Sequence, residues 1–222
     1  MGARMRVGII GCGNIFDQYI AGCRLFEVLE VIACADLDMQ RARQRAQQYS
    51  LQALTVDELL AHPDIEIVVN LTIPAAHRQV SLAAIAAGKH IYSEKPLAIT
   101  TAEGREILRA AAERGVRVGC APDTFLGGSL QTCIRLVSEG AIGTPVAATA
   151  FFATHGPESW HPNPAFYYQV GGGPVLDMGP YYLTALITML GSVRTVAGAS
   201  RATFTQRTAT SPSRNGETFP VE

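Results

Sequence analysis

The stretch Gly8-Ile-Ile-Gly-Cys-Gly-Asn14 decides the fold of the N-terminal half of the chain. It stands between an apolar run, Arg6–Ile10, and a helical pattern over Ile15–Leu25. A glycine-rich turn in this position is typical of a site for the pyrophosphate of a dinucleotide, because the helix N-terminus offers free N–H groups and a positive dipole end. Gly11 permits the tight turn, and Gly13 lets the backbone approach the phosphates.

The residues after this turn continue to alternate between short apolar runs and helical patterns. This alternation predicts a doubly wound α/β Rossmann fold, a parallel sheet covered by helices on both faces. We expect six strands, five of them over Arg6–Ile10, Leu29–Ala35, Ile65–Leu71, His90–Ser93 and Val116–Cys120. We expect helices over Ile15–Leu25, Met39–Tyr49 and Pro74–Ala87, and after the capping boxes Thr55-Val-Asp-Glu58 and Thr100-Thr-Ala-Glu103.

The pattern changes after Ala121, so we predict a domain boundary there. Residues 1–121 would form the dinucleotide-binding domain, and residues 122–222 a partial α+β domain with an open, mainly antiparallel sheet. Its strands are expected over Val146–His155 and Val193–Phe204, and its helices over Leu130–Glu139 and Asp177–Leu190. The last segment, Thr205–Glu222, is polar and rich in turn-forming residues.

Composition narrows the classes of function. The chain has 222 residues, of which 48% are hydrophobic and 17% charged, with a formal net charge of −1. Such a composition is typical of a folded soluble protein and indicates neither a nucleic-acid nor a membrane partner. The five cysteines contain no CxxC pair, and the histidines show no H-E-x-x-H spacing. We therefore expect reduced thiols, a cytoplasmic location and no metal site.

Asp36 adds a second element to the glycine turn. It ends the second expected strand, where a carboxylate accepts hydrogen bonds from the adenosine ribose hydroxyls and repels a 2′-phosphate. NAD(H) is therefore favoured over NADP(H). Phe16 stands where the fingerprint has its third glycine, which predicts a shifted or re-angled first helix. Methyltransferases that use S-adenosylmethionine also combine a glycine turn with such an acid, so this motif alone leaves them open.

Three further segments carry a family resemblance. They are Asn70-Leu-Thr-Ile-Pro-Ala-Ala-His77, Ser93-Glu-Lys-Pro96 and Gly171-Gly-Gly-Pro-Val-Leu-Asp-Met-Gly-Pro-Tyr-Tyr182. Together with the glycine turn, they make the chain resemble the Gfo/Idh/MocA oxidoreductases, the glucose-fructose oxidoreductase and inositol dehydrogenase group. The resemblance covers nearly the whole chain. It implies hydride transfer between a nicotinamide cofactor and a sugar, polyol or related hydroxy/keto compound, and it argues against a methyltransferase.

The resemblance and the strand ends together give the candidate site residues. The expected cofactor contacts lie in the loops that follow strands: Gly11, Gly13, Asn14, Ile15, Asp36, Leu71, Thr72, Pro74, His77, Glu94, Lys95 and Pro96. The expected catalytic residues are Lys95, Asp177 and Tyr181. Lys95 is our candidate for proton transfer, because desolvation lowers the pKa of a lysine toward neutrality.

The two other catalytic candidates come from the resemblance. Asp177 matches the family aspartate of the substrate site, and Tyr181 stands where many members have a catalytic histidine. A phenol has an ordinary pKa of roughly 10, so we place Lys95 above Tyr181 as the acid/base. His155, Trp160 and His161 either line a polyol pocket or pack within a loop.

The resemblance also implies expectations about the extent, the assembly and the activity of the chain. The second domain of the resembled family normally continues further, so we expect a C-terminally truncated chain. A homo-oligomer is expected for a full-length form, and is doubtful for this chain. The alternative to catalysis is a dinucleotide-binding protein without turnover, or an inactive fragment.

Overall fold

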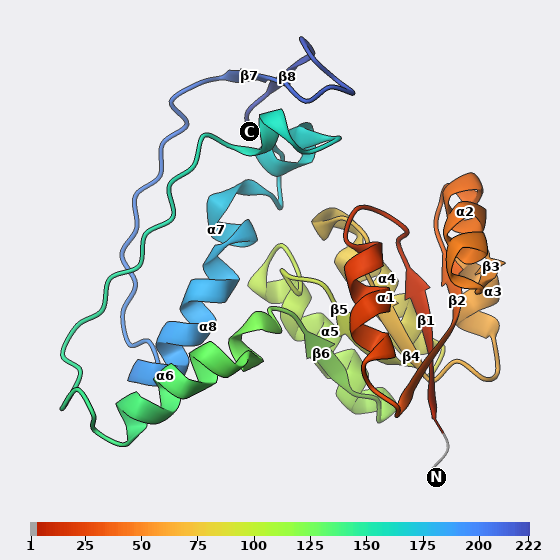
Figure 1. Ribbon diagram of the computed structural model, residues 1–222, viewed down its shortest axis with the longest axis horizontal. Helices are drawn as coiled ribbons and strands as arrows, with labels where there is room; N and C mark the ends of the chain where they lie inside the picture. Colours follow the sequence, from red (N-terminus) through yellow and green to blue (C-terminus); the bar gives the residue numbers. More distant parts are fainter. Residues whose placement is uncertain (1–3) are drawn as a thin grey trace. The chain divides into compact units, whose positions relative to one another are not determined.

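The computed structural model describes residues 4–222, and the chain divides into two compact units (Figure 1). The first unit is Met1–Ala121 and the second is Pro122–Glu222. They differ in how much regular structure they contain, so each is described by itself.

The first unit is built on a six-stranded sheet in the order β3-β2-β1-β4-β5-β6, with every neighbouring pair parallel. The chain order reverses between β1 and β4. In sheets of this kind, ligands bind beyond the carboxyl ends of the strands at that reversal. The strands are β1 (Met5–Ile10), β2 (Leu29–Ala35), β3 (Gln52–Leu54), β4 (Ile67–Asn70), β5 (His90–Ser93) and β6 (Val118–Cys120). The predicted parallel Rossmann sheet is therefore confirmed.

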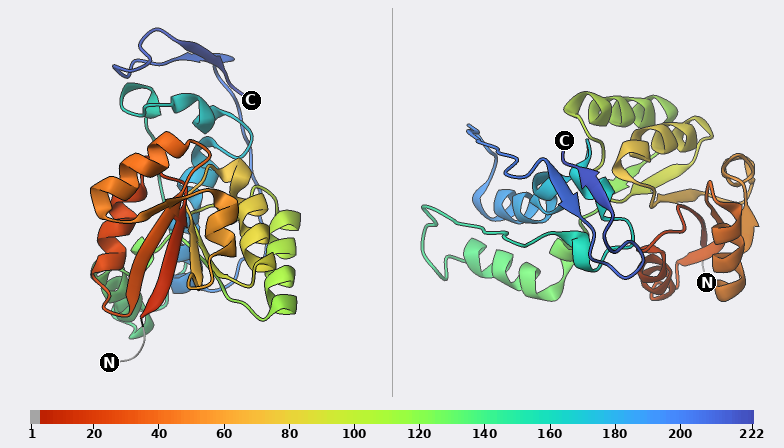
Figure 2. Two further views of the ribbon diagram at one scale, coloured as in Figure 1. Left: turned by 90° about the vertical axis from the view of Figure 1, so that its right-hand side faces the viewer. Right: turned by 90° about the horizontal axis from the view of Figure 1, so that it is seen from above.

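Helices cover both faces of this sheet, as the left view of Figure 2 shows. Alternate side chains of β1 point to opposite faces, so Val7 and Ile9 pack in one buried cluster and Ile10 in another. The first cluster includes residues of α1 and α2, and the second includes residues of α3 and α4. The five helices are α1 (Phe16–Arg24), α2 (Met39–Tyr49), α3 (Val56–Ala61), α4 (Pro74–Ala86) and α5 (Thr101–Arg114).

Local sequence signals explain where these helices begin and end. Thr55 and Thr100 each form a complete capping box with the glutamate three residues later, as predicted. Gly115 ends α5 in the left-handed conformation. The sixth expected strand is Gln52–Leu54. Its bounds could not be predicted, because three residues are too few to show a period.

The second unit contains less regular structure. Its helices are α6 (Gly128–Ser138), α7 (Gly173–Asp177) and α8 (Gly179–Leu190), with short 3₁₀ turns at η1 (Thr124–Leu126), η2 (Pro157–Ser159) and η3 (Pro164–Tyr168). The expected helix Asp177–Leu190 is interrupted at Met178, where α8 begins anew. Pro180 explains the break, because proline lacks an N–H and suits the start of a helix.

The expected strands Val146–His155 and Val193–Phe204 are wrong as strands. Both segments run as long extended traces (Figure 1), but neither is in a strand ladder. The described antiparallel sheet is instead a pair of short strands, β7 (Gln206–Thr208) and β8 (Thr218–Pro220), inside the segment expected to be irregular. An apolar β-prone run forms a strand only where another strand accepts its hydrogen bonds.

A buried ion pair holds part of the second unit together. Glu158 is only 1% exposed, and its carboxylate accepts hydrogen bonds from Arg207 Nε and from Tyr168 Oη, the latter at 2.7 Å. Burial raises the pKa of Glu158, but the bonds from Arg207 and Tyr168 outweigh it and leave that pKa below its usual range. The pair ties β7 to η2 and η3.

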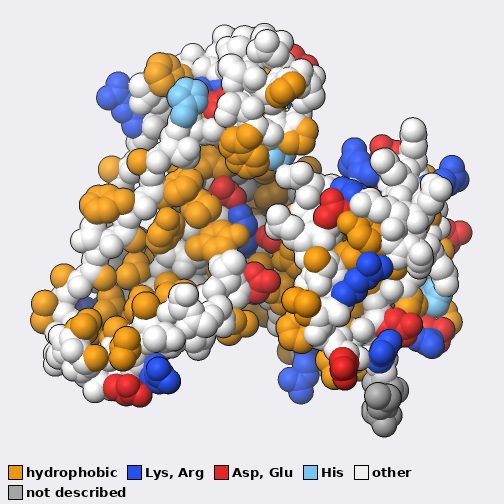
Figure 3. All heavy atoms as spheres, viewed as in Figure 1, with side chains coloured by type: hydrophobic (Ala, Val, Ile, Leu, Met, Phe, Trp, Pro, Cys, Tyr) orange, Lys and Arg blue, Asp and Glu red, His pale blue; other side chains and the backbone are white. Residues whose placement is uncertain are grey.

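Many apolar side chains of the second unit face solvent. Figure 3 shows them gathered over the helices and extended segments of this unit. The exposed set includes Leu136 of α6, Leu183 and Ile187 of α8, and Phe151 and Val196 of the extended segments.

Candidate active site

The glycine turn connects β1 to α1, and its backbone is fixed by neighbouring loops. Gly11 has φ +102°, a left-handed conformation that favours glycine, and its N–H donates to the carbonyl of Ala35 at 2.8 Å. A Cβ at Gly11 would lie 2.6 Å from the carbonyl carbon and oxygen of Leu71. Glycine is therefore required for both the conformation and the close approach of two loops.

Gly13 shows the opposite situation. A Cβ built at Gly13 would meet no protein atom within 4 Å, and no side chain caps the start of α1. The turn thus leaves open space beside a helix N-terminus, whose positive dipole end favours an anion. This open cradle fits a diphosphate, which the residue types of the turn also predict.

Phe16 shows how the helix accommodates a large residue at the third fingerprint position. It begins α1, is fully buried, and packs its ring against Tyr49 at 5.9 Å between centroids. Arg45 of α2 lies over the same ring, donates to Asp17 at 2.6 Å, and lies 3.4 Å from the carbonyl oxygen of Gly13. The turn and the start of α1 are thus braced from α2.

Asp36 lies directly after β2 and is tied to the glycine turn. Its Oδ2 accepts a hydrogen bond from the backbone N–H of Cys12 at 2.8 Å, and its Oδ1 accepts one from Asp38 at 2.9 Å. Arg41 Nη1 is 3.6 Å from the same Oδ2. Each carboxylate oxygen keeps lone-pair capacity beyond its backbone bond. Asp36 is therefore placed to accept hydrogen bonds from a ribose beside the turn.

Two buried residues organise the loop after β4. Asn70 Oδ1 accepts bonds from the N–H and hydroxyl of Thr72, and its Nδ2 donates to the carbonyl of His77. The His77 ring is fully buried, with Nδ1 2.6 Å from the carbonyl oxygen of Pro96 and Nε2 2.9 Å from that of Thr72. His77 therefore bridges the loops that follow β4 and β5.

The Glu94-Lys95-Pro96 segment follows β5. The N–H of Glu94 donates to the carbonyl of Asn70 at 2.9 Å, and the Lys95–Pro96 peptide bond is cis. Glu94 Oε1 accepts a hydrogen bond from Tyr19 Oη at 2.8 Å, while Oε2 accepts one from the N–H of Lys95, also at 2.8 Å. Tyr19 lies on α1, so this carboxylate links the first helix to the Lys95 loop.

The structure brings the predicted cofactor residues of the first unit to one edge of the sheet. They occupy the loops after β1, β2, β4 and β5 and the first turn of α4, and backbone bonds such as Leu71 N–H to Ile10 O, at 2.8 Å, connect the loops. Sequence reasoning missed Tyr19 and Arg45, which act across helices. No local motif marks either residue, because their partners are 75 and 28 residues away in the chain.

The thiols near this edge are poor nucleophiles. A hydrogen bond with Cys34, together with burial, raises the pKa of Cys12. Burial raises the pKa of Cys120, at the end of β6, to about 12. Both groups stay protonated at neutral pH, so they pack as small apolar side chains.

The second unit holds the remaining candidates. Asp177 is the last residue of α7, Tyr181 lies in the first turn of α8, and the charge of Asp177 acts on His161 and Tyr167. Burial lowers the pKa of His161, whose Nδ1 accepts a bond from the N–H of Asn163 at 2.9 Å. His161 is thus neutral at neutral pH, and its other nitrogen carries the proton.

The aromatic candidates differ in their surroundings. The Trp160 ring lies 5.4 Å from the His161 ring, edge to face, yet Trp160 remains largely exposed. His155 is also exposed, and its Nδ1 lies 3.7 Å from a Glu158 oxygen. Exposed Trp160 therefore packs on half-buried His161, whereas His155 borders the buried ion pair.

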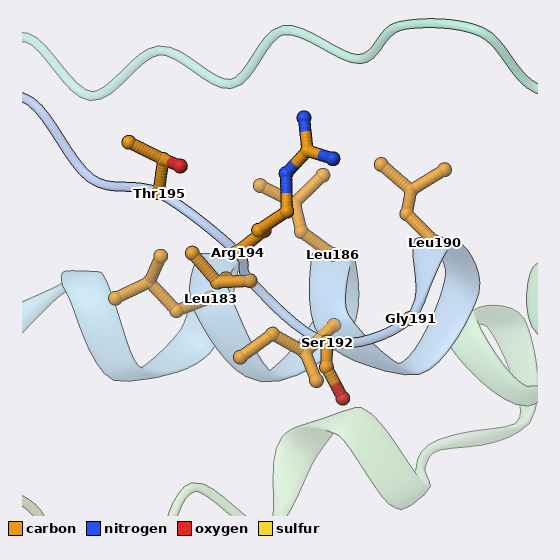
Figure 4. Close-up of a pocket in the computed structure, with 9 residues that line it drawn as sticks. Leu183, Leu186, Leu190, Gly191, Ser192, Arg194 and Thr195 are labelled. Atoms are coloured by element: carbon orange, nitrogen blue, oxygen red, sulfur yellow. The ribbon is translucent and has the colours of Figure 1, made fainter.

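A cavity of about 440 Å³ also lies in the second unit (Figure 4). Leucines of α8 form one side, and the segment that follows the helix forms the other. Its lining contains no predicted site residue and consists of Leu183, Leu186, Ile187, Leu190, Gly191, Ser192, Val193, Arg194 and Thr195. The cavity is mainly apolar and carries no group suited to acid–base work.

Within residues 4–222, no group of three or more histidine, cysteine or acidic side chains is arranged to hold a metal ion. None of the helices in the same residues is long and apolar enough to cross a membrane.

A parallel sheet of this strand order, an open glycine cradle and an acid after β2 define a dinucleotide-binding protein of the Rossmann class. Residues 5–121 match the model of an oxidoreductase family with an NAD-binding Rossmann fold, GFO_IDH_MocA. Residues 130–217 match that family's C-terminal domain. The chain belongs to the Gfo/Idh/MocA oxidoreductase family, so the predicted resemblance is confirmed.

Individual relatives and solved structures agree with this family assignment. 1,5-Anhydro-D-fructose reductase of Ensifer adhaerens is 32% identical over 78% of this chain and 53% of its own. An NAD binding oxidoreductase from Klebsiella pneumoniae is 26% identical, with a TM-score of 0.80 over 99% of this chain and 61% of its own. A mutant of KijD10, a 3-ketoreductase from Actinomadura kijaniata in complex with TDP-benzene and NADP, is 25% identical, with a TM-score of 0.74 over 85% and 56%. The chain thus spans between 53% and 61% of these relatives.

Proposed function

We propose that this chain carries the cofactor domain and part of the substrate domain of an NAD(H)-dependent oxidoreductase. Residues 1–121 would bind the dinucleotide, and residues 122–222 would contribute to substrate binding. The observation that carries the proposal is the open space at Gly13, beside the uncapped start of α1 and the carboxylate of Asp36. The family of the relatives supports the same reaction class.

For the cofactor, we propose a preference for NAD(H). Asp36 is held beside the turn by two backbone N–H groups, where its carboxylate would repel a 2′-phosphate. Arg41, whose Nη1 is 3.6 Å from Asp36 Oδ2, would weaken that repulsion. A relative with bound NADP makes this preference worth measuring.

The chain's own residues would divide the chemistry as follows. When bound, the nicotinamide supplies the hydride acceptor or donor. The Lys95 amine would hold the proton that leaves or reaches the substrate oxygen, since oxidation of an alcohol releases one proton with each hydride. Asp177 and Tyr181 would bind substrate hydroxyls, and neutral His161 offers a further N–H donor. The substrate class we propose is a sugar, a polyol or a related hydroxy/keto compound.

His77 takes an indirect role in this proposal. Both of its ring nitrogens lie against protein carbonyls, and the ring is fully buried. We propose that it fixes the loops after β4 and β5 around the cofactor, whereas Thr72 in the loop and Pro74 at the start of α4 offer the direct contacts. His77→Gln tests this, because the amide can still donate to one of the two carbonyls while the contact with the other is lost.

Two substitutions test the proposal. Asp36→Asn removes the charge at the ribose and should raise the relative affinity for NADPH, measured by calorimetric titration against NADH. Lys95→Met removes the amine and should leave NADH binding within about twofold while lowering turnover by at least about 100-fold. Turnover is followed by NADH absorbance with a panel of sugars and polyols. An unchanged NADH/NADPH ratio in Asp36→Asn would remove Asp36 from the site.

A second candidate function is dinucleotide binding without turnover. Tyr181 favours it, because a phenol in the place of an imidazole does not exchange protons readily at neutral pH. The two functions separate in one assay: tight NADH binding with no oxidation of any panel member supports the binding protein. A cytoplasmic location and a homo-oligomeric full-length form remain part of our proposal.

A further inference from the structure

Two features of functional interest lie within the first turn of helix α1. Its N-terminus stands at the open cradle of Gly13, and Tyr19 lies four residues after the N-cap Ile15, to whose carbonyl its N–H donates at 3.3 Å. The backbone that would receive a diphosphate is therefore in rigid connection with the Tyr19 side chain.

Tyr19 reaches the loop of the proposed proton carrier. Its hydroxyl donates to Glu94 Oε1 at 2.8 Å, a charge-assisted bond of the stronger kind. The other oxygen of the same carboxylate accepts the backbone N–H of Lys95 at 2.8 Å. Glu94 is thus held at both oxygens, by α1 on one side and by the Lys95 backbone on the other.

The same loop is held again at its next residue. The carbonyl of Pro96 lies 2.6 Å from His77 Nδ1, in the first turn of α4. The loop therefore has one tie to α1 and one to α4. The tie to α4 is buried, whereas Tyr19 and Glu94 are half-buried at the carboxyl edge of the sheet.

We propose that Tyr19 is a positioning residue, which through Glu94 fixes the Lys95 backbone relative to the helix that binds the diphosphate. This inference rests on the proposed role of Lys95. Tyr19 touches neither the proton nor the hydride in this scheme. It sets the distance between the bound dinucleotide and the Lys95 amine, and a tether lost there allows the loop to occupy several positions.

The test uses Tyr19→Phe, which removes one hydroxyl and keeps the ring that packs against Tyr92 at 6.3 Å between centroids. Tyr49→Phe is the matched control, because the Tyr49 hydroxyl also donates to a carboxylate, Asp17, at 2.6 Å, and Tyr49 ends α2, which packs beside β2 and β3. Glu94→Gln is the conservative variant, since an amide still forms a hydrogen bond with both Tyr19 and the Lys95 N–H.

The readout is the acetylation rate of Lys95 by acetic anhydride, followed by peptide mass spectrometry with and without saturating NADH. In the natural chain, NADH should slow acetylation by about tenfold or more, because the amine is held against the cofactor. In Tyr19→Phe this protection should fall below about twofold, while the NADH dissociation constant changes by less than about twofold. Tyr49→Phe should keep full protection, and Glu94→Gln most of it.

The outcomes separate two failures. If NADH binds but does not protect Lys95 in the natural chain, the proposed role of Lys95 is wrong, and this inference falls with it. If NADH protects Lys95 equally in the natural chain and in Tyr19→Phe, the role of Tyr19 alone is wrong. Thermal unfolding of each variant accompanies the labelling. If Tyr19→Phe does not fold, loss of protection in folded Glu94→Ala supports the tether, and full protection there overturns it.

Discussion

The two units of this chain treat similar apolar sequences differently. In the first, the strands are sealed between helices, and the three buried clusters of the described residues all belong to it. In the second, the apolar runs around Phe151 and Val196 are extended and exposed, and Glu158–Arg207 supplies a buried ion pair in place of a large core. The difference teaches that an apolar run becomes a strand only where other strands and helices cover it.

The largest expected difference between the units is in proteolysis. Thermolysin should cleave within residues 146–155 and 193–204 at least about 100-fold faster than within residues 5–120, because exposed extended backbone needs no unfolding before cleavage. Fragment masses over time measure both rates. Equal rates in the two units would mean that the second is as well packed as the first, against the comparison drawn above.

Two glycine substitutions should separate stability from binding within the first unit. Gly11→Ala places a Cβ 2.6 Å from the Leu71 carbonyl at a positive φ, so it should destabilise this unit by about 2–4 kcal/mol. Gly13→Ala meets no protein atom within 4 Å and should change stability by less than about 1 kcal/mol. Urea unfolding of both variants measures this, and equal losses would contradict the account of the turn.

Arg207→Met should act on the second unit alone. It leaves the buried carboxylate of Glu158 without its cation, which costs about 3 kcal/mol in buried pairs. Hydrogen exchange should rise in β7 and η3 and stay unchanged in the first unit. Arg194→Met, a residue beside the apolar cavity, is the control. Increased exchange in β1 or β4 would show that the units are not independent.

The smallest expected effect is on pH dependence in the second unit. Burial lowers the folded-state pKa of His161 below its ordinary value, so the folded state disfavours the charged ring. The stabilising contribution is therefore present above the ordinary pKa and is lost as the pH falls through the folded-state value. The loss should stay below about 1 kcal/mol and should vanish in His161→Gln. If the natural chain becomes more stable on acidification, and His161→Gln does not, the assignment is wrong.

The sequence predicted the first unit well because its signals are local. The glycine turn, the capping boxes at Thr55 and Thr100, and the acid after β2 each depend on a few neighbouring residues. The strands of the second unit could not be predicted in the same way, since a ladder needs a partner whose position no local pattern gives. Tyr19 escaped prediction for the same reason, because its partner Glu94 is distant in sequence.

The central claim is that the turn at Gly13 and the start of α1 bind a nicotinamide dinucleotide. Calorimetric titration of the natural chain and of Gly13→Ala with NADH tests it most directly. The account predicts saturable binding with one molecule per chain, and an affinity at least about tenfold lower in Gly13→Ala, because its methyl group occupies the space of the diphosphate. Equal affinity in the two chains, with both folded, would contradict the claim.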